Sequence, residues 1–246
     1  MNICLFKSEE INAPLSVKDD RGEHIIKILH KKEGDSFAAG VINGSAGKAV
    51  ISKIENSQIY FDFIPESEGK PLYPLKMIIG FPRPIQLKRL LRDIAALGVS
   101  EVHLTGTELG EKSYMQSNLV EHGTAYQMLI DGTVQAAGTH VPELFLHKTL
   151  RECIESPGLK IGNELKLCLD NINPTGSIMG VLCAQKNKPE TVIAAIGSER
   201  GWTENERRLL EEAGYLRTGM GPRVMRTETA ATVSASVISA WMGWLE

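Results

Sequence analysis

The sequence predicts an α/β protein with a largely parallel sheet covered by helices on both faces, preceded by a small β-barrel domain. From Lys76 onward, short apolar runs rich in β-branched residues alternate with stretches of helical periodicity, an order that favours a parallel sheet. Before Ile64 the apolar residues alternate over short spans, as in antiparallel strands. The 246 residues, 42% of them hydrophobic, can bury one large core or two modest ones.

The N-terminal region has the pattern of short β-strands joined by tight turns. Asn43 and Gly44 form a turn of the kind that closes a hairpin. The segment Pro65–Pro74 combines prolines with charges and is predicted to be a linker. We therefore divide the chain into a first domain over residues 1–68 and a second over residues 72–246. The strands of the first domain are predicted over Ser36–Ile42, Lys48–Ile54 and Gln58–Ile64.

The second region alternates strands and helices. Pro84 suits the first turn of a helix and Gly98 its end. The apolar segment Thr229–Trp241 is predicted to be the last helix. Other strands are predicted over Lys76–Gly80, Glu101–Thr105, Leu165–Asp170 and Thr191–Ile196, and other helices over Pro84–Gly98 and Leu119–Ala137.

Two glycine-bearing loops lie near the C-terminus. The first, Ile196–Trp202 (IGSERGW), ends a buried strand, and Thr203 with Glu206 forms a capping box for the helix that follows. Gly197 and Gly201 are expected to take positive φ values and to turn backbone N–H groups toward a ligand, where open α/β sheets bind ligands. A plain connection between strand and helix is the alternative.

The second loop, Gly221–Ala230 (GPRVMRTETA), places two arginines just before the last helix. Cations are unfavourable at the positive end of a helix dipole, so Arg223 and Arg226 are expected to serve a ligand rather than the fold. The alternative is that either arginine pairs with Glu228 or Glu199 and holds the loop in place.

These two loops resemble the C-terminal signature of the RsmE-type methyltransferases, SPOUT-superfamily enzymes that methylate N3 of a uridine in 16S ribosomal RNA. That family typically shows GxRILRTETA near its C-terminus, preceded by IGPEGGF. Weaker resemblances extend along the chain, at His24–Asp35, Leu90–Leu104 and Gln135–Leu144. The chain is therefore identified as a divergent member of this family.

The resemblance implies a fold and a cofactor. It implies a PUA-like β-barrel that binds RNA, followed by a SPOUT domain whose C-terminal segment forms a trefoil knot, and it implies a homodimer. S-adenosylmethionine is expected as the cofactor, in a pocket beside the knot. The residues expected to bind it are Leu169, Ile196, Gly197, Glu199, Gly201, Leu216, Met220, Gly221, Val224 and Thr229.

Uridine methylation, as the resemblance implies it, assigns roles to two residues. N3 of uridine carries a proton and is a poor nucleophile until negative charge is stabilised or the proton is removed. Arg226 is expected to stabilise the developing anion at a uracil oxygen. Glu228 is expected either to orient Arg226 or to accept the proton, directly or through water.

The overall charge does not favour RNA binding. Lys and Arg total 27 against 30 Asp and Glu, for a net charge of −3. Contact with ribosomal RNA is therefore expected to rely on local basic patches. Each patch taken singly has an alternative explanation as an ordinary solvated face. The residues expected to contact RNA are Lys27, Lys31, Arg89, Arg92 and Arg223.

Departures from the family pattern leave two alternatives open. Ser198 and Arg200 replace a proline and a glycine of the first loop, and Gly138 and His30 stand where the family has arginines. The alternatives are a SPOUT-like methyltransferase with a different RNA target, and a non-catalytic relative that binds RNA or the ribosome.

The remaining composition predicts neither metal nor membrane association. The four cysteines and six histidines show no paired spacing along the sequence, so no metal site and no disulfide are predicted. No run of about 18 apolar residues and no leader-like N-terminus occurs, so the protein is expected to be cytoplasmic.

Overall fold

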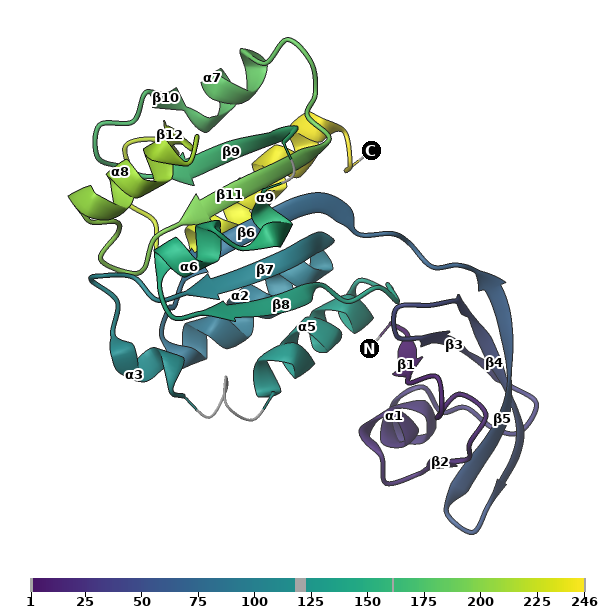
Figure 1. Cartoon of the computed structure of the whole chain (residues 1–246). Coiled ribbons are helices and arrows are strands. Elements are labelled where there is room, and N and C mark those ends of the chain that lie inside the picture. Colours follow the sequence, from purple (N-terminus) through teal and green to yellow (C-terminus); the bar gives the residue numbers. More distant parts are fainter. Residues whose placement is uncertain (1, 118–122, 161, 246) are drawn as a thin grey trace. The chain divides into compact units, whose positions relative to one another are not determined.

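The computed structural model describes residues 2–117, 123–160 and 162–245, and the chain divides into two compact units (Figure 1). The first unit comprises Met1–Pro71 together with Ile130–Val141. The second comprises Leu72–Leu129 and Pro142–Glu246. No helix in the described part of the chain is long and apolar enough to span a bilayer.

The first unit contains a curled five-stranded sheet that forms half of a barrel. Its order is β1-β3-β4-β5-β2, with β1 and β3 parallel and the other neighbours antiparallel. The three predicted strands are present, and the turn at Asn43 and Gly44 lies between two of them. The bounds are β1 Cys4–Phe6, β2 Leu15–Ser16, α1 Asp20–Glu23, the π-helical turn η1 His24–Ile28, β3 Ser36–Val41, β4 Ala46–Glu55 and β5 Gln58–Ser67.

The linker predicted over Pro65–Pro74 is wrong in part, because β5 continues through Pro65 to Ser67. Pro65 pairs with Gly47 beside a register shift in β4, at a place where β2 no longer borders β5. A proline lacks the N–H that an inner strand needs, and this position at the sheet margin does not require one.

A later segment of the chain is bonded into this first unit. The backbone N–H of Asn43 donates to Thr139 O at 2.9 Å, and the Thr139 hydroxyl donates to Gly44 O at 2.7 Å. The N–H of Val141 donates to Asn43 Oδ1 at 2.8 Å. The hairpin turn is therefore held by residues almost a hundred positions further along the chain.

The second unit contains a seven-stranded sheet, parallel throughout, as the alternation of strands and helices predicts. Its order is β10-β12-β9-β11-β6-β7-β8. The short strands β8, β10 and β12 were not predicted. The bounds are β6 Tyr73–Gly80, β7 Val99–Thr105, β8 Glu143–His147, β9 Glu164–Leu169, β10 Gly176–Ser177, β11 Thr191–Ile196 and β12 Leu216–Gly219.

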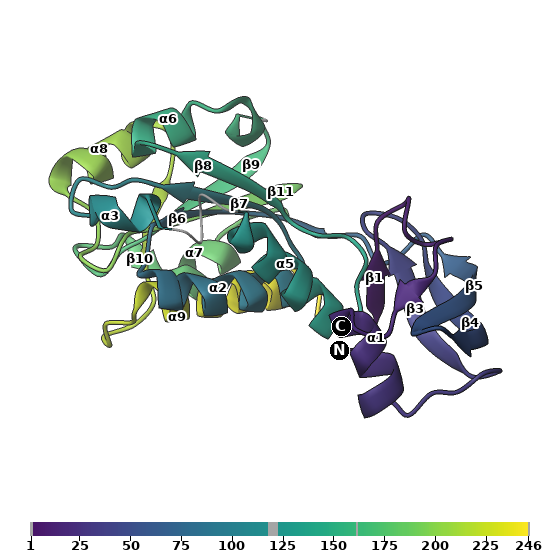
Figure 2. The same cartoon turned by 90° about the horizontal axis from the view of Figure 1, so that it is seen from below.

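Helices cover both faces of this sheet, with α6 and α8 on one face and α2 and α9 on the other (Figure 2). The capping box of α8 is confirmed: Thr203 Oγ1 accepts from Glu206 N, and the Glu206 carboxylate accepts from Thr203 N. The bounds are α2 Pro84–Ala96, α3 Lys112–Met115, α5 Thr124–Gln135, α6 Leu150–Ile154, the 3-10 turn η2 Pro157–Leu159, α7 Ile178–Cys183, α8 Glu204–Glu212 and α9 Thr227–Met242.

Two predicted helix bounds differ from the structure. The helix predicted over Leu119–Ala137 is described as Thr124–Gln135, and residues 118–122 lie outside the described residues. The last helix begins at Thr227 rather than Thr229, because the carbonyl of Arg226 already accepts from the N–H of Ala230 at 2.8 Å.

The two ends of the second unit meet at its first strand. The Tyr73 and Trp244 rings stack with centroids 5.1 Å apart, and the Tyr73 hydroxyl donates to Trp244 O at 2.7 Å. Gly243 stops α9 in the left-handed conformation and turns Trp244 back toward this contact. The end of α9 is thereby fixed beside the start of β6.

Helix α2 offers a matched test of its buried face. Ile94 is fully buried and Ile85 is 64% exposed on the same helix. We expect Ile94→Ala to lower the free energy of unfolding by about 2–5 kcal/mol through a core cavity. Ile85→Ala should change it by less than about 0.5 kcal/mol, as surface substitutions do. Urea unfolding followed by circular dichroism measures both, and equal losses would contradict the assignment of the faces.

Candidate active site

Three segments of the second unit meet at one edge of its sheet and line a cavity of about 380 Å³. They are the end of β9 with the residues after it, the loop between β11 and α8, and the loop between β12 and α9. Parallel strands carry their carboxyl ends to the same edge, which is where open α/β sheets bind ligands. The lining residues named below come from all three segments.

The loop after β11 folds back on itself. Gly201 has φ of +72°, and its N–H donates to Ser198 O at 2.8 Å. Gly197 does not take the positive φ expected of it, so that prediction is wrong. Glycine is required there for a different reason: a Cβ would lie 2.9 Å from the carbonyl carbon of Gly201. The cavity wall is therefore bare backbone at this point.

The same loop is bonded to the start of α9. The buried hydroxyl of Thr227 donates to Gly197 O at 3.2 Å. This bond holds the two glycine-bearing loops side by side, although about thirty residues separate them. Ser198 Oγ, also buried at the cavity wall, has no hydrogen-bond partner among the described residues.

A buried ion pair forms part of the cavity floor. Arg207 Nε lies 2.6 Å from Asp170 Oδ2, and the two side chains are 7% and 2% exposed. Burial acts against the charge on Arg207, but the hydrogen bond to Asp170 and the charges of Asp170 and Glu204 outweigh it and raise the pKa of the guanidinium. Asp170 Oδ1 also accepts from Ile172 N at 3.0 Å, which shapes the turn after β9.

A second cavity of about 370 Å³ adjoins the first and shares Glu199, Val224 and Met225 with it. The other residues that line it are Arg83, Gln86, Arg226 and Glu228. Arg226 is exposed and precedes the first residue of α9, and Glu228 is half-buried in the first turn of that helix. The two residues with predicted catalytic roles therefore lie in one cavity, next to the glycine-lined one.

The arginines of the second loop are not held by carboxylates. Within the described ranges, neither Arg223 nor Arg226 makes an ion pair. Glu199 instead pairs with Arg83, whose Nε lies 3.2 Å from Glu199 Oε2. Hydrogen bonding to the Tyr114 hydroxyl and the charge of Glu199 raise the pKa of Arg83. In the described part of the chain, neither Glu199 nor Glu228 forms the ion pair with Arg223 or Arg226 that the alternative required.

Most of the residues predicted to bind the cofactor line the first cavity. Leu216 and Thr229 do not: Leu216 begins β12, pairs with Leu167 and is 42% exposed, while Thr229 is exposed on α9. Leu216 is the first residue of β12, whereas the lining residues of this segment begin at Met220, after the strand ends. The predicted residues that line the cavity are Leu169, Ile196, Gly197, Glu199, Gly201, Met220, Gly221 and Val224.

The residues predicted to contact RNA are scattered over both units. Lys27, in the first unit, forms an ion pair with Glu23 at 2.7 Å. Lys31 is half-buried in the same unit. In the second unit, Arg89 and Arg92 are exposed on α2, and Arg223 is exposed at the rim of the first cavity.

Several lining residues were not predicted. Asp170 is the last residue of the predicted strand Leu165–Asp170. Its position at the carboxyl end of a parallel strand could have indicated that it lines a ligand site. Arg207 and Arg83 come from α8 and from the residue before α2. Nothing in their sequence context indicates that they turn toward the cavities.

Comparisons with known proteins identify similar chains over nearly the whole length. Residues 68–239 match the family of RNA methyltransferase domains. The chain is 41% identical to ribosomal RNA small subunit methyltransferase E from Treponema pallidum, over 98% of this chain and 91% of that protein. It is 29% identical to ribosomal RNA small subunit methyltransferase E 1 from Borreliella burgdorferi, over 98% of each.

A solved structure has the same fold. The ribosomal RNA small subunit methyltransferase E from Neisseria gonorrhoeae, solved with bound S-adenosylmethionine, superposes with a TM-score of 0.75. The match covers 98% of this chain and 97% of that chain at 18% identity.

The Asp170–Arg207 pair generates a test. We expect Arg207→Met to lower the free energy of unfolding by about 3–5 kcal/mol, because it leaves a buried carboxylate without its partner. The double variant Asp170→Asn with Arg207→Met should recover most of that loss, since the neutral amide keeps its oxygen toward Ile172 N. Chemical denaturation measures all three proteins. A double variant no more stable than the single one would show that the charge is not the cause.

Proposed function

The chain belongs to the family of ribosomal RNA small subunit methyltransferase E, and we propose on that premise that it transfers a methyl group from S-adenosylmethionine to N3 of a uridine in 16S ribosomal RNA. The observation that carries the proposal is the pair of adjoining cavities. One is walled by glycine backbone, the other holds Arg226 and Glu228, and Glu199, Val224 and Met225 border both.

The first cavity suits the cofactor. Its volume of about 380 Å³ lies in the range of small-molecule sites, and it combines apolar walls with backbone polar groups. The unpartnered Ser198 hydroxyl is a buried group that a ligand can satisfy. S-adenosylmethionine, when bound, supplies a methyl group on a cationic sulfonium. Leu169, Ile196, Gly201 and Met220 would hold it, with Glu199 at the border of the two cavities.

The second cavity suits the uracil base. Arg226 is held at the start of α9 and has no carboxylate to neutralise it in the described part of the chain. Its guanidinium is therefore available to stabilise negative charge on a uracil oxygen as N3 loses its proton. Glu228 lies in the same cavity, and it either orients Arg226 or receives the N3 proton.

The proposal also covers the RNA-binding surface, the knot and the oligomeric state. The first unit is proposed to be a PUA-like domain that contacts RNA through Lys27 and Lys31, with Arg89, Arg92 and Arg223 contacting RNA from the second unit. The loop between β12 and α9 is proposed to complete a trefoil knot, and the active form is proposed to be a cytoplasmic homodimer. The exposed arginines of α2 support the RNA surface.

Two alternatives to this proposal are each tested by a separate experiment. A different RNA target is favoured by Gly138 and by His30, where the chain lacks the family's arginines and where His30 has φ of +51°. A non-catalytic relative is favoured by Arg200, a long cationic side chain at the wall of the first cavity. Calorimetric titration with S-adenosylmethionine distinguishes the non-catalytic relative from a methyltransferase, because a protein with a closed pocket would show no saturable heat of binding.

The substrate is tested with RNA that lacks the modification. Protein and S-adenosylmethionine are incubated with unmodified 16S RNA or small subunits, and nucleosides are identified by mass spectrometry. Our proposal expects 3-methyluridine, and a reverse-transcription stop locates it because the methyl group blocks the pairing edge. Binding of S-adenosylmethionine with methylation of another base or another RNA would support the first alternative.

Arg226 generates a prediction about catalysis. We expect Arg226→Ala to reduce the single-turnover rate of methyl transfer by about 10²–10³-fold, the usual effect of removing one donor to a developing anion. The calorimetric affinity for S-adenosylmethionine should stay near the unsubstituted value. Arg208→Ala is the matched control, since Arg208 is exposed on α8 and borders neither cavity. An Arg226→Ala protein with near-normal rate would refute the role.

Glu228 generates a second prediction about catalysis. If Glu228 accepts the proton, Glu228→Gln should lose about 10²–10⁴-fold in rate, as general bases do, and the loss should persist at all pH values. If it orients Arg226, the amide oxygen of glutamine still accepts a hydrogen bond and most of the rate remains. Rates for Glu228→Gln and Glu228→Ala, measured side by side over pH 6–9, distinguish the two roles. Normal activity in Glu228→Ala would exclude both.

A further inference from the structure

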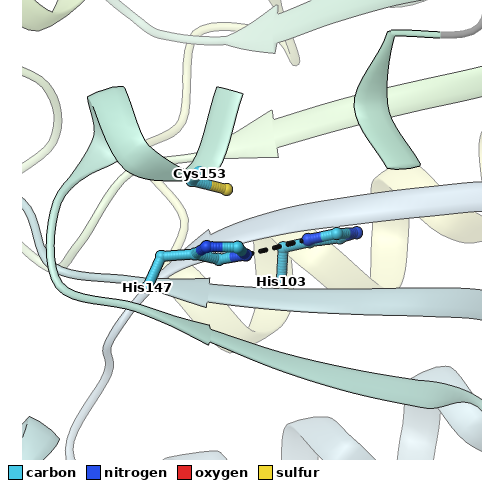
Figure 3. Close-up of side chains that lie close together, drawn as sticks. All are labelled: His103, His147 and Cys153. Carbon is cyan, nitrogen blue, oxygen red and sulfur yellow. Dashed lines mark hydrogen bonds between the residues drawn. The ribbon is translucent and has the colours of Figure 1, made fainter. Parts of the chain in front are cut away.

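Two histidines and a cysteine lie together in the second unit, away from both cavities described above. His103 comes from the middle of β7, His147 from the end of β8 and Cys153 from α6 (Figure 3). One ligand atom from each lies within 4.8 Å of the others, and all three residues are buried. Their positions in the sequence give no sign of this cluster, which explains why no metal site was predicted.

The sheet register brings the two histidines to the same face. His103 pairs with Phe145 and Thr105 pairs with His147, so the histidines are diagonal neighbours on adjacent strands. Their rings are nearly parallel, with centroids 5.3 Å apart. Helix α6 packs over this face and places Cys153 beside them. β7, β8 and α6 thus bring two imidazole nitrogens and one sulfur atom close together.

Hydrogen bonds determine which nitrogen of His103 is available. His103 Nε2 lies 3.1 Å from Glu101 Oε2, and the other oxygen of Glu101 pairs with Lys76 Nζ at 2.5 Å. Lys76 in turn donates to Gly158 O at 2.7 Å. A carboxylate paired with lysine accepts a hydrogen bond from Nε2–H, which leaves the lone pair of His103 on Nδ1. That nitrogen faces His147 Nε2 at 3.0 Å.

This arrangement has the form of a metal site with its outer support in place. Metal-bound histidines usually donate their second N–H to a carboxylate, as His103 does to Glu101. Two imidazoles and a thiolate are ligands that zinc prefers.

We propose that His103 Nδ1, His147 Nε2 and Cys153 Sγ bind a zinc ion that joins β7, β8 and α6. A tetrahedral zinc ion, with bonds of about 2.0–2.1 Å to nitrogen and 2.3 Å to sulfur, separates its ligand atoms by roughly 3.3–3.6 Å. The 3.0 Å between the two nitrogens is close to this. Without the ion, His147 Nε2–H donates to His103 Nδ1. Binding therefore releases the thiol proton of Cys153 to solvent and moves the His147 proton from Nε2 to Nδ1, so that both imidazoles stay neutral.

A surface cavity borders the cluster at His147. His147 is one of the residues that line a surface cavity of about 610 Å³, together with Thr149, Glu152 and Ser156. His147 is 8% exposed, against 1% for His103 and 0% for Cys153, so it is the member of the cluster nearest to solvent. The cavity shares no lining residue with the two cavities of the candidate active site, so the expected role is to stabilise the fold rather than to take part in methyl transfer.

Cobalt is the probe for this site. The full-length protein is stripped with a chelator, kept reduced and titrated with Co²⁺. We expect one ion per chain, the visible absorption of tetrahedral cobalt and a near-ultraviolet thiolate-to-cobalt band, all removed by one equivalent of Zn²⁺. A folded, reduced protein that binds no Co²⁺ and no Zn²⁺ would overturn the proposal.

Matched variants assign the ligands. Cys153→Ser should abolish the thiolate band, whereas Cys168→Ser, which alters another buried thiol of the same core cluster, should keep it. His147→Gln should lose tetrahedral binding, and His140→Gln in the first unit should not. Glu101→Gln should weaken zinc binding by about 10–100-fold, as loss of an outer partner does. Persistence of the band in Cys153→Ser would overturn the assignment, and His147→Gln decides it if Cys153→Ser does not fold.

Discussion

Backbone pairing among β9, β11 and β6 is the constraint on which the candidate active site depends. Ile196 stands opposite Leu169 on one side and Ile79 on the other, so the three strands end at the same level. The residues that follow must then turn within a small space. At Gly80 a Cβ would lie 2.5 Å from Ser198 N, so the turn after β11 rests directly on the end of β6. Strand register thus sets the position of the loops after β9 and β11 that line the first cavity.

Charged residues at the carboxyl edge of the sheet form separate ion pairs around the two cavities. Asp170 and Arg207 neutralise each other at the cavity floor, where an unpaired charge would be costly. Arg83 holds Glu199 at the border between the cavities. Arg226 lies in the second cavity and makes no ion pair among the described residues.

Sequence patterns predicted the elements that neighbouring residues alone determine. β11 is a run of six buried apolar or β-branched residues, and α8 has a capping box, so both were predicted with accurate starts. β12 (Leu216–Gly219) is short and carries an arginine, and it is a strand only because β9 and β10 border it. The Asp170–Arg207 pair and the histidine–cysteine cluster depend on which side chains the register and helix packing bring together. No spacing along the sequence encodes such encounters.

The first unit is interrupted in sequence, and this has an evolutionary consequence. Asn43 and Gly44 are bonded to Thr139 and Val141, while the chain between these two segments includes Leu72–Leu129, the first part of the second unit. A single recombination event at the domain boundary would separate the hairpin from the segment that secures it. The two units are therefore expected to be inherited together and to diversify by substitution, rather than to be exchanged as modules among unrelated proteins.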